Sequence, residues 1–147
     1  SPKLQHVLII DNHPDHVQTI RDTLTQGNSG CDIVVITCPD EAIQYLRHQD
    51  QYANTPQPHL ILLDPDLAMA TQTQDGLTIL ATIKADPRLK RTPIVVLTLS
   101  DDTATIFNSY LLQGNCYVIK PSSLQELAHI VKRIEEFWLS IVTLPVE

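Results

Sequence analysis

The chain has 147 residues, 43% of them hydrophobic and 18% charged, which is the length and composition of one globular domain. Its formal net charge of -7 argues against nucleic-acid binding, because a phosphate backbone attracts basic surfaces. No apolar run reaches the ~18 residues that a membrane-spanning helix needs, so we expect no membrane partner. The three cysteines form no CxxC pair, and their odd number is typical of the reducing cytoplasm.

Short apolar runs predict five strands, at residues 4–10, 32–37, 59–63, 93–97 and 116–119. Each is followed by a stretch with helical spacing, beginning near Pro14, Pro39, Gly76, Ser100 and Ser123. Ser123 and Glu126 match a capping box. The strict alternation predicts an α/β fold, a (βα)5 doubly wound five-stranded parallel sheet. We expect one domain over residues 1–147, with residues 143–147 as a tail and no output domain.

Four of the predicted strands end in a residue with useful chemistry: Asp11, Asp64, Thr98 and Lys120. Each one alone is equally well explained as a strand terminus or a helix cap. The carboxyl ends of parallel strands meet at one edge of a sheet, so we expect the four side chains to lie together. Clustered carboxylates can hold Mg²⁺, and one of them can attack phosphorus. An ammonium and a hydroxyl can then stabilise the charge on the phosphoryl oxygens.

Five motifs occur in order along the chain: LIIDN (8–12), LILLDPDL (60–67), Asp75-Gly76, IVVLTLS (94–100) and YVIKP (117–121). Together they resemble the receiver domain of two-component response regulators, which implies a flavodoxin-like fold. A finer resemblance, to single-domain regulators of cyanobacterial phytochrome kinases, is carried by residues 86–91 (DPRLKR), 115–117 (NCY), 134–139 (IEEFWL) and 143–145 (TLP). The resemblance implies a phosphorelay protein rather than an enzyme, with a histidine kinase, of the phytochrome type, as phosphoryl donor.

The resemblance also assigns roles to individual residues. Asp64 is the implied phosphoacceptor, Thr98 the switch hydroxyl and Lys120 the ammonium that contacts the phosphate. Tyr117 is the implied aromatic switch, although a plain core position would explain it as well. Pro121 would follow Lys120 through a cis peptide bond.

Mg²⁺ would be held by Asp11, Asn12, Asp64 and the backbone carbonyl of Asp66. Three departures from the family pattern affect this site. Asn12 replaces the second acid of the pair, so we expect weak Mg²⁺ binding. Pro65 follows the acceptor and has no N–H to offer a phosphoryl oxygen. The loop over residues 65–75 is longer than usual, and it either shields the phosphate or is a tolerated insertion.

The last predicted helix carries a core-facing stripe of Leu124, Leu127, Val131, Ile134, Trp138 and Ile141. Ile130 and Phe137, with Ala128, widen the apolar face beyond that stripe. We interpret Ile130, Phe137 and Trp138 as the interface of a homodimer, against the alternative that the tail folds over its own domain.

Other interpretations remain open from the sequence. A degenerate receiver would signal by protein binding without phosphorylation. An aspartate-nucleophile phosphatase would use the DxD spacing of Asp64 and Asp66, but that motif follows the third strand instead of opening the chain. His13 and His16 could form a transition-metal site with the nearby acids, although a solvated pair at a helix start is the preferred interpretation. Neither the kinase nor the downstream target can be named from the sequence.

Overall fold

The computed structural model describes residues 5–27, 31–65, 76–99 and 116–139. Five strands form one parallel sheet in the order β2-β1-β3-β4-β5. Their bounds are β1 Gln5–Ile10, β2 Cys31–Ile36, β3 Leu60–Leu63, β4 Ile94–Thr98 and β5 Cys116–Ile119. The predicted parallel sheet is confirmed, and each strand begins and ends within one residue of the predicted bounds.

The described helices are α1 Pro14–Gly27, α2 Pro39–Leu46, α3 Gly76–Ala85 and α5 Leu124–Ile134, with a 3₁₀ turn at Asp50–Tyr52 and a π-helical turn at Glu135–Leu139. Both α1 and α2 begin at a proline, whose fixed φ suits the first helical position. The Ser123 hydroxyl accepts a hydrogen bond from the Glu126 N–H at 3.0 Å, which confirms the predicted cap. The helix predicted from Ser100 lies outside the described residues. Among the described helices, none is long and apolar enough to cross a membrane.

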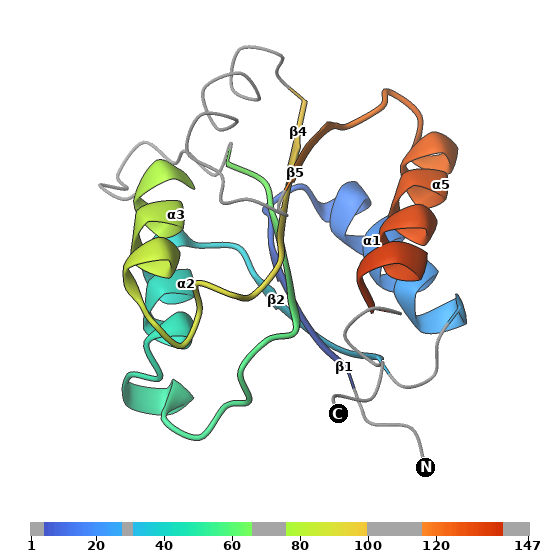
Figure 1. Ribbon diagram of the computed structural model, residues 1–147. Coiled ribbons are helices and arrows are strands. Elements are labelled where there is room, and N and C mark those ends of the chain that lie inside the picture. Colours follow the sequence, from blue (N-terminus) through green and yellow to red (C-terminus); the bar gives the residue numbers. More distant parts are fainter. Residues whose placement is uncertain (1–4, 28–30, 66–75, 100–115, 140–147) are drawn as a thin grey trace.

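The sheet is covered on both faces, by α2 and α3 on one side and by α1 and α5 on the other (Figure 1). Alternate strand residues enter two separate cores. Leu8 and Val96 pack with residues of α2 and α3, whereas Val7 and Val95 pack with residues of α1 and α5. Burial on both faces explains why the central strands β3 and β4 are continuous apolar runs.

Helix α5 buries Leu127, Val131 and Ile134 against the sheet layer, as its spacing predicts. The predicted stripe is wrong at its first position, because Leu124 is 44% exposed. Leu124 is the first helical residue after the cap, and the buried stripe begins one turn later. Ile141 lies outside the described residues.

The strand register brings the predicted site residues to one edge of the sheet. Ile10 is paired with Leu63, so Asp11 and Asp64 follow at the same level on neighbouring strands. The Asp64 N–H donates to the Ile10 carbonyl at 2.8 Å, and the Lys120 N–H donates to the Thr98 carbonyl at 2.6 Å. Backbone hydrogen bonds therefore fix the base of each side chain before its own contacts are considered.

Candidate functional site

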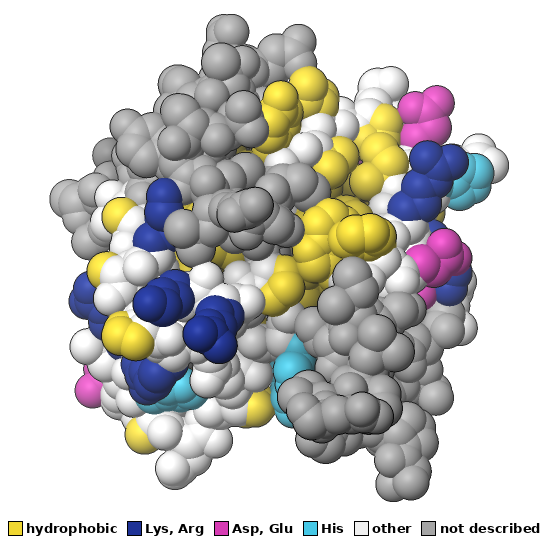
Figure 2. Space-filling model, viewed as in Figure 1, with side chains coloured by type: hydrophobic (Ala, Val, Ile, Leu, Met, Phe, Trp, Pro, Cys, Tyr) yellow, Lys and Arg dark blue, Asp and Glu magenta, His cyan; other side chains and the backbone are white. Residues whose placement is uncertain are grey.

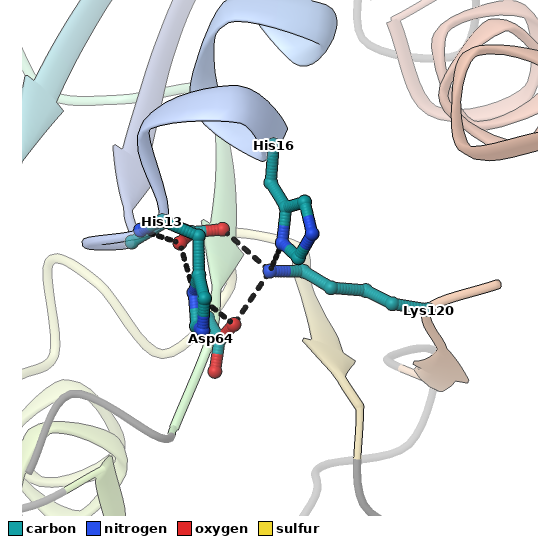
Figure 3. A network of polar contacts seen from close by, with 5 residues as sticks. His13, His16, Asp64 and Lys120 are labelled. Carbon is teal, nitrogen blue, oxygen red and sulfur yellow. Dashed lines mark hydrogen bonds and ion pairs between the residues drawn. The ribbon is translucent and has the colours of Figure 1, made fainter. Parts of the chain in front are cut away.

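Lys120 lies at the centre of a buried polar network at the carboxyl edge of the sheet (Figure 3). Its Nζ is 2.8 Å from Asp11 Oδ2 and 2.5 Å from Asp64 Oδ2. The exposed fraction of the side chain is 0% for Lys120, 2% for Asp11 and 0% for Asp64. Charges so fully removed from water are tolerated when they are paired through charge-assisted hydrogen bonds. The structure thus brings together three of the predicted site residues, contributed by β1, β3 and β5.

His13 bridges the two carboxylates. Its backbone N–H donates to Asp11 Oδ1 at 2.9 Å, which closes a turn just before α1. Its ring Nδ1 is 2.9 Å from Asp11 Oδ1 and 3.2 Å from Asp64 Oδ2. Since ionised carboxylates only accept hydrogen bonds, the His13 Nδ1 carries the proton and donates it to them.

His16 contacts the same network from the first turn of α1. Its Nδ1 is 2.9 Å from Lys120 Nζ, and because an ammonium has no acceptor, the imidazole nitrogen accepts. Burial lowers the pKa of His16, and the positive charge of Lys120 and the neighbouring His13 lower it further, against a smaller opposing effect of Asp11 and Asp64. The ring is therefore held in the neutral form that this contact needs.

The preferred interpretation of the two histidines as a solvated pair is wrong. Both are half-buried, their rings stack with centroids 4.8 Å apart, and each contacts a predicted site residue. A usable signal was present in the sequence: His13 follows Asp11 by two residues, and His16 follows His13 by one helical turn. That spacing directs both rings to the end of β1.

The remaining predicted residues lie around this network. Thr98 is fully buried at the end of β4, next to β3, and Asn12 is half-buried directly after Asp11. Tyr117 is 38% exposed on the edge strand β5, so the alternative of a plain core residue does not describe it. The peptide bond before Pro121 is trans, so the expected cis bond is wrong. Trans is the intrinsically favoured isomer, by about 0.5–1 kcal/mol. Asp66 and residues 66–75 of the long loop lie outside the described residues.

The donor chemistry suits a hard divalent cation. The buried carboxylates of Asp11 and Asp64 and the amide of Asn12 lie at this edge of the sheet. All three offer oxygen, the ligand atom that Mg²⁺ prefers. Three carboxylate oxygens, Asp11 Oδ1, Asp11 Oδ2 and Asp64 Oδ2, already accept hydrogen bonds from Lys120 or His13. A bound cation would therefore compete with these donors for the same oxygens.

A second feature is an apolar surface formed by α5 and β5. A groove of about 430 Å³, here called the α5 groove, is lined by Val118, Ile130, Arg133, Ile134, Phe137 and Trp138. Hydrophobic side chains gather on this side of the molecule (Figure 2). Phe137 is 59% exposed, whereas the adjacent Trp138 is half-buried against the core and contacts the Phe137 ring edge-on, with centroids 4.7 Å apart. The predicted interface residues thus lie on one continuous surface.

Comparison with known proteins supports one family. The model of the response regulator receiver domain matches residues 7–132. The response regulator Rcp1 of Synechocystis sp. is 36% identical over 139 residues, which cover 95% of this chain and 92% of Rcp1.

Solved structures agree with this result. The phosphorylated cyanobacterial phytochrome response regulator RcpA superposes with a TM-score of 0.84 at 41% identity, over 97% of this chain and 99% of RcpA. The Mn²⁺-bound form of Rcp1 superposes with a TM-score of 0.83 at 35% identity, again over 97% and 99% of the two chains. The flavodoxin-like receiver fold predicted from the sequence is therefore confirmed.

Proposed function

The chain belongs to the response regulator receiver family of two-component signalling, and we propose that it accepts a phosphoryl group from a histidine kinase on Asp64. The observation that carries the proposal is the Asp64 carboxylate, which is buried at the carboxyl end of β3 beside Asp11 and hydrogen-bonded to Lys120. A carboxylate held next to a second acid and a cation has the chemistry of a phosphoacceptor. The proposed role is that of a signalling protein, and the phosphatase interpretation loses its support to the family match.

In the proposed reaction, an Asp64 carboxylate oxygen attacks the phosphorus of a phosphohistidine. A P–O bond forms, the P–N bond breaks, and the imidazole leaves with the bonding electron pair. Lys120 is already within hydrogen-bond distance of Asp64, so its ammonium can pair with one negative oxygen of the new phosphoryl group. The buried Thr98 hydroxyl, on the neighbouring strand, donates to another phosphoryl oxygen.

The proposed metal ligands are Asp11, Asn12, Asp64 and the backbone carbonyl of Asp66. Mg²⁺ bound there would supply positive charge to the phosphoryl oxygens. Asn12 brings an oxygen without a charge, which supports weak Mg²⁺ binding. Pro65 has no N–H to donate to the phosphoryl group, so stabilisation of the phosphoryl charge depends more on Lys120 and Thr98.

The proposed output is a changed surface on the side of β5 and α5. When Lys120 and Thr98 turn toward the phosphoryl group, Tyr117, which is partly exposed on β5, changes rotamer. The neighbouring α5 groove, with Ile130, Phe137 and Trp138, is the proposed homodimer interface. Within the described residues, four of the five exposed large hydrophobic side chains belong to β5, α5 or the π-helical turn: Tyr117, Ile119, Leu124 and Phe137.

The proposed partner is a phytochrome-type histidine kinase in the cytoplasm. The likeness to RcpA, a phytochrome response regulator, supports this choice. Rcp1 matches this chain over 92% of its own length. The three cysteines without a CxxC pair support the location.

The test is the intact mass of the protein after incubation with acetyl phosphate and Mg²⁺. Wild type should gain one phosphoryl group, Asp64→Asn none, and Asp15→Asn, an exposed acid in the first turn of α1, as much as wild type. If Asp64→Asn gained as much phosphate as wild type, a residue other than Asp64 would be the phosphoacceptor. If wild type gains no phosphoryl group from acetyl phosphate or from a phosphorylated kinase, the protein is instead a degenerate receiver that signals by binding alone.

A further inference from the structure

Three potential metal ligands meet where β1 passes into α1. Asp11, His13 and His16 each offer one ligand atom, and these atoms all lie within 4.8 Å of one another. Asp11 is buried and the two imidazoles are half-buried, so part of the cluster remains accessible to solvent. The rings of His13 and His16 project from the start of α1 toward Asp64 and Lys120 (Figure 3).

We infer that Asp11, His13 and His16 form a second metal site, which takes a borderline transition-metal ion such as Zn²⁺ in place of Mg²⁺. The donor set decides the class of ion: imidazole suits Zn²⁺, Cu²⁺ and Ni²⁺, whereas Mg²⁺ prefers oxygen alone. Three protein ligands with the fourth position open to water are a common Zn²⁺ arrangement. At bond lengths of about 2.0–2.2 Å, the ligand atoms would lie roughly 3.3 Å apart. The ligand atoms, which lie within 4.8 Å of one another, would reach that spacing through side-chain rotation of the half-buried His13 and His16.

The two oxygens of Asp11 allow the ion and Lys120 to coexist. Oδ1 faces His13, and Oδ2 faces Lys120. An ion bound through Oδ1 takes the place of the His13 Nδ1 proton, which passes to Nε2 through water, so that the imidazole stays neutral. The contacts of Lys120 with Asp11 Oδ2 and Asp64 Oδ2 stay in place. His16 already directs a lone pair at a positive charge, the Lys120 ammonium, so it needs to lose no proton to bind the ion.

Occupancy has a consequence for signalling, which rests on the proposed function. An ion on Asp11 and His13 withdraws Asp11 from the Mg²⁺ ligands. Zn²⁺ should therefore slow phosphorylation of Asp64 by acetyl phosphate, and additional Mg²⁺ should not fully restore it. Metal binding itself does not depend on phosphorylation, so the two proposals fail separately.

The test is a calorimetric titration of the whole chain with Zn²⁺ and, separately, with Mg²⁺. Wild type should bind one Zn²⁺ more tightly than Mg²⁺, and His13→Ala and His16→Ala should each weaken that Zn²⁺ binding by at least about tenfold. Removing a residue that only hydrogen-bonds to a metal ligand already lowers metal affinity by about 10–100-fold, so loss of a ligand itself should cost at least as much. Neither substitution should weaken Mg²⁺ binding. His129→Ala, an exposed histidine on α5, is the matched control and should bind Zn²⁺ as wild type does. Zn²⁺ bound by thiols elsewhere persists in all variants and cancels in the comparison.

Two results would overturn the inference. Equal Zn²⁺ affinity in wild type, His13→Ala and His16→Ala would show that the imidazoles are not ligands. An equal loss of Zn²⁺ and Mg²⁺ affinity in His13→Ala would show one shared site without selectivity. Thermal unfolding of each apo variant checks that the fold is kept. The visible absorption of Co²⁺ bound to wild type provides a second readout, since its spectrum reports nitrogen and oxygen ligands without any substitution.

Discussion

Replacing Lys120 by methionine should destabilise the fold strongly. The Lys120 ammonium is the shared partner of Asp11 and Asp64, at 2.8 and 2.5 Å, and none of the three side chains is more than 2% exposed. Methionine keeps much of the side-chain length and removes the charge, which leaves two buried carboxylates without the cation they share. Removing one partner of a buried ion pair costs about 3–5 kcal/mol. Because two carboxylates lose their cation, we expect the upper part of that range for the free energy of unfolding.

The measurement is urea unfolding at neutral pH with EDTA present, so that no metal ion replaces the missing charge. Lys132→Met is the control: its side chain is 44% exposed and its ammonium pairs with one carboxylate, the buried Glu135, at 2.9 Å. Because solvent screens the lysine and only one carboxylate loses its cation, we expect a smaller loss than for Lys120→Met. Adding Asp64→Asn to Lys120→Met should recover part of the loss, because one stranded charge disappears. A loss for Lys120→Met no larger than that for Lys132→Met would refute the reasoning.

Two further predictions concern the surface and the edge of the fold. Phe137→Asp places a charge in the α5 groove and should abolish dimerisation in sedimentation equilibrium. Leu124→Asp, at an exposed apolar residue of α5 that does not line the groove, should leave dimerisation intact, and equal behaviour of the two variants would argue against this interface. Burial raises the pKa of the Cys31 thiol to about 11, with the negative charges of Glu135 and Asp32 adding to the effect. Since the thiolate is the reactive form, alkylation of Cys31 below pH 9 should be about 100-fold slower in folded than in unfolded protein, and equal rates measured by peptide mass spectrometry would contradict this.

The centre of the sheet was predictable because β1, β3 and β4 are buried on both faces. Leu60–Leu63, for example, is a run of four apolar residues, all buried, that ends at Asp64. Such a run followed by an acid marks both the strand and the edge at which the site lies. The same rule found Asp11 and Lys120, although the direct contact between them depends on strand order, which periodicity alone does not give.

Contacts that depend on side-chain direction were harder to predict. The sequence places His13 and His16 near two acids. The turn closed by the His13 N–H on Asp11 directs the His13 ring inward, and the first turn of α1 places His16 beside Lys120. A histidine at a helix start is usually solvated, so the preferred interpretation followed the common case. Leu124 is a similar case. Its spacing fits the buried stripe, but it is exposed because it lies at the start of the helix, one turn before the part that packs against the core.

Asn12, His13 and His16 all affect the net charge of the site and therefore which metal ion it binds. With Asp11 and Asp64 ionised and Lys120 protonated, the buried network carries one net negative charge when both imidazoles are neutral. A second acid in place of Asn12 would make the site one charge more negative and a stronger binder of Mg²⁺. The imidazoles offer ligand atoms without adding negative charge. That difference favours ions that form strong bonds to nitrogen over Mg²⁺, whose binding depends more on ligand charge. Asn12→Asp should therefore strengthen Mg²⁺ binding much more than Zn²⁺ binding, and an equal gain for both ions would argue against a separate nitrogen-ligated site.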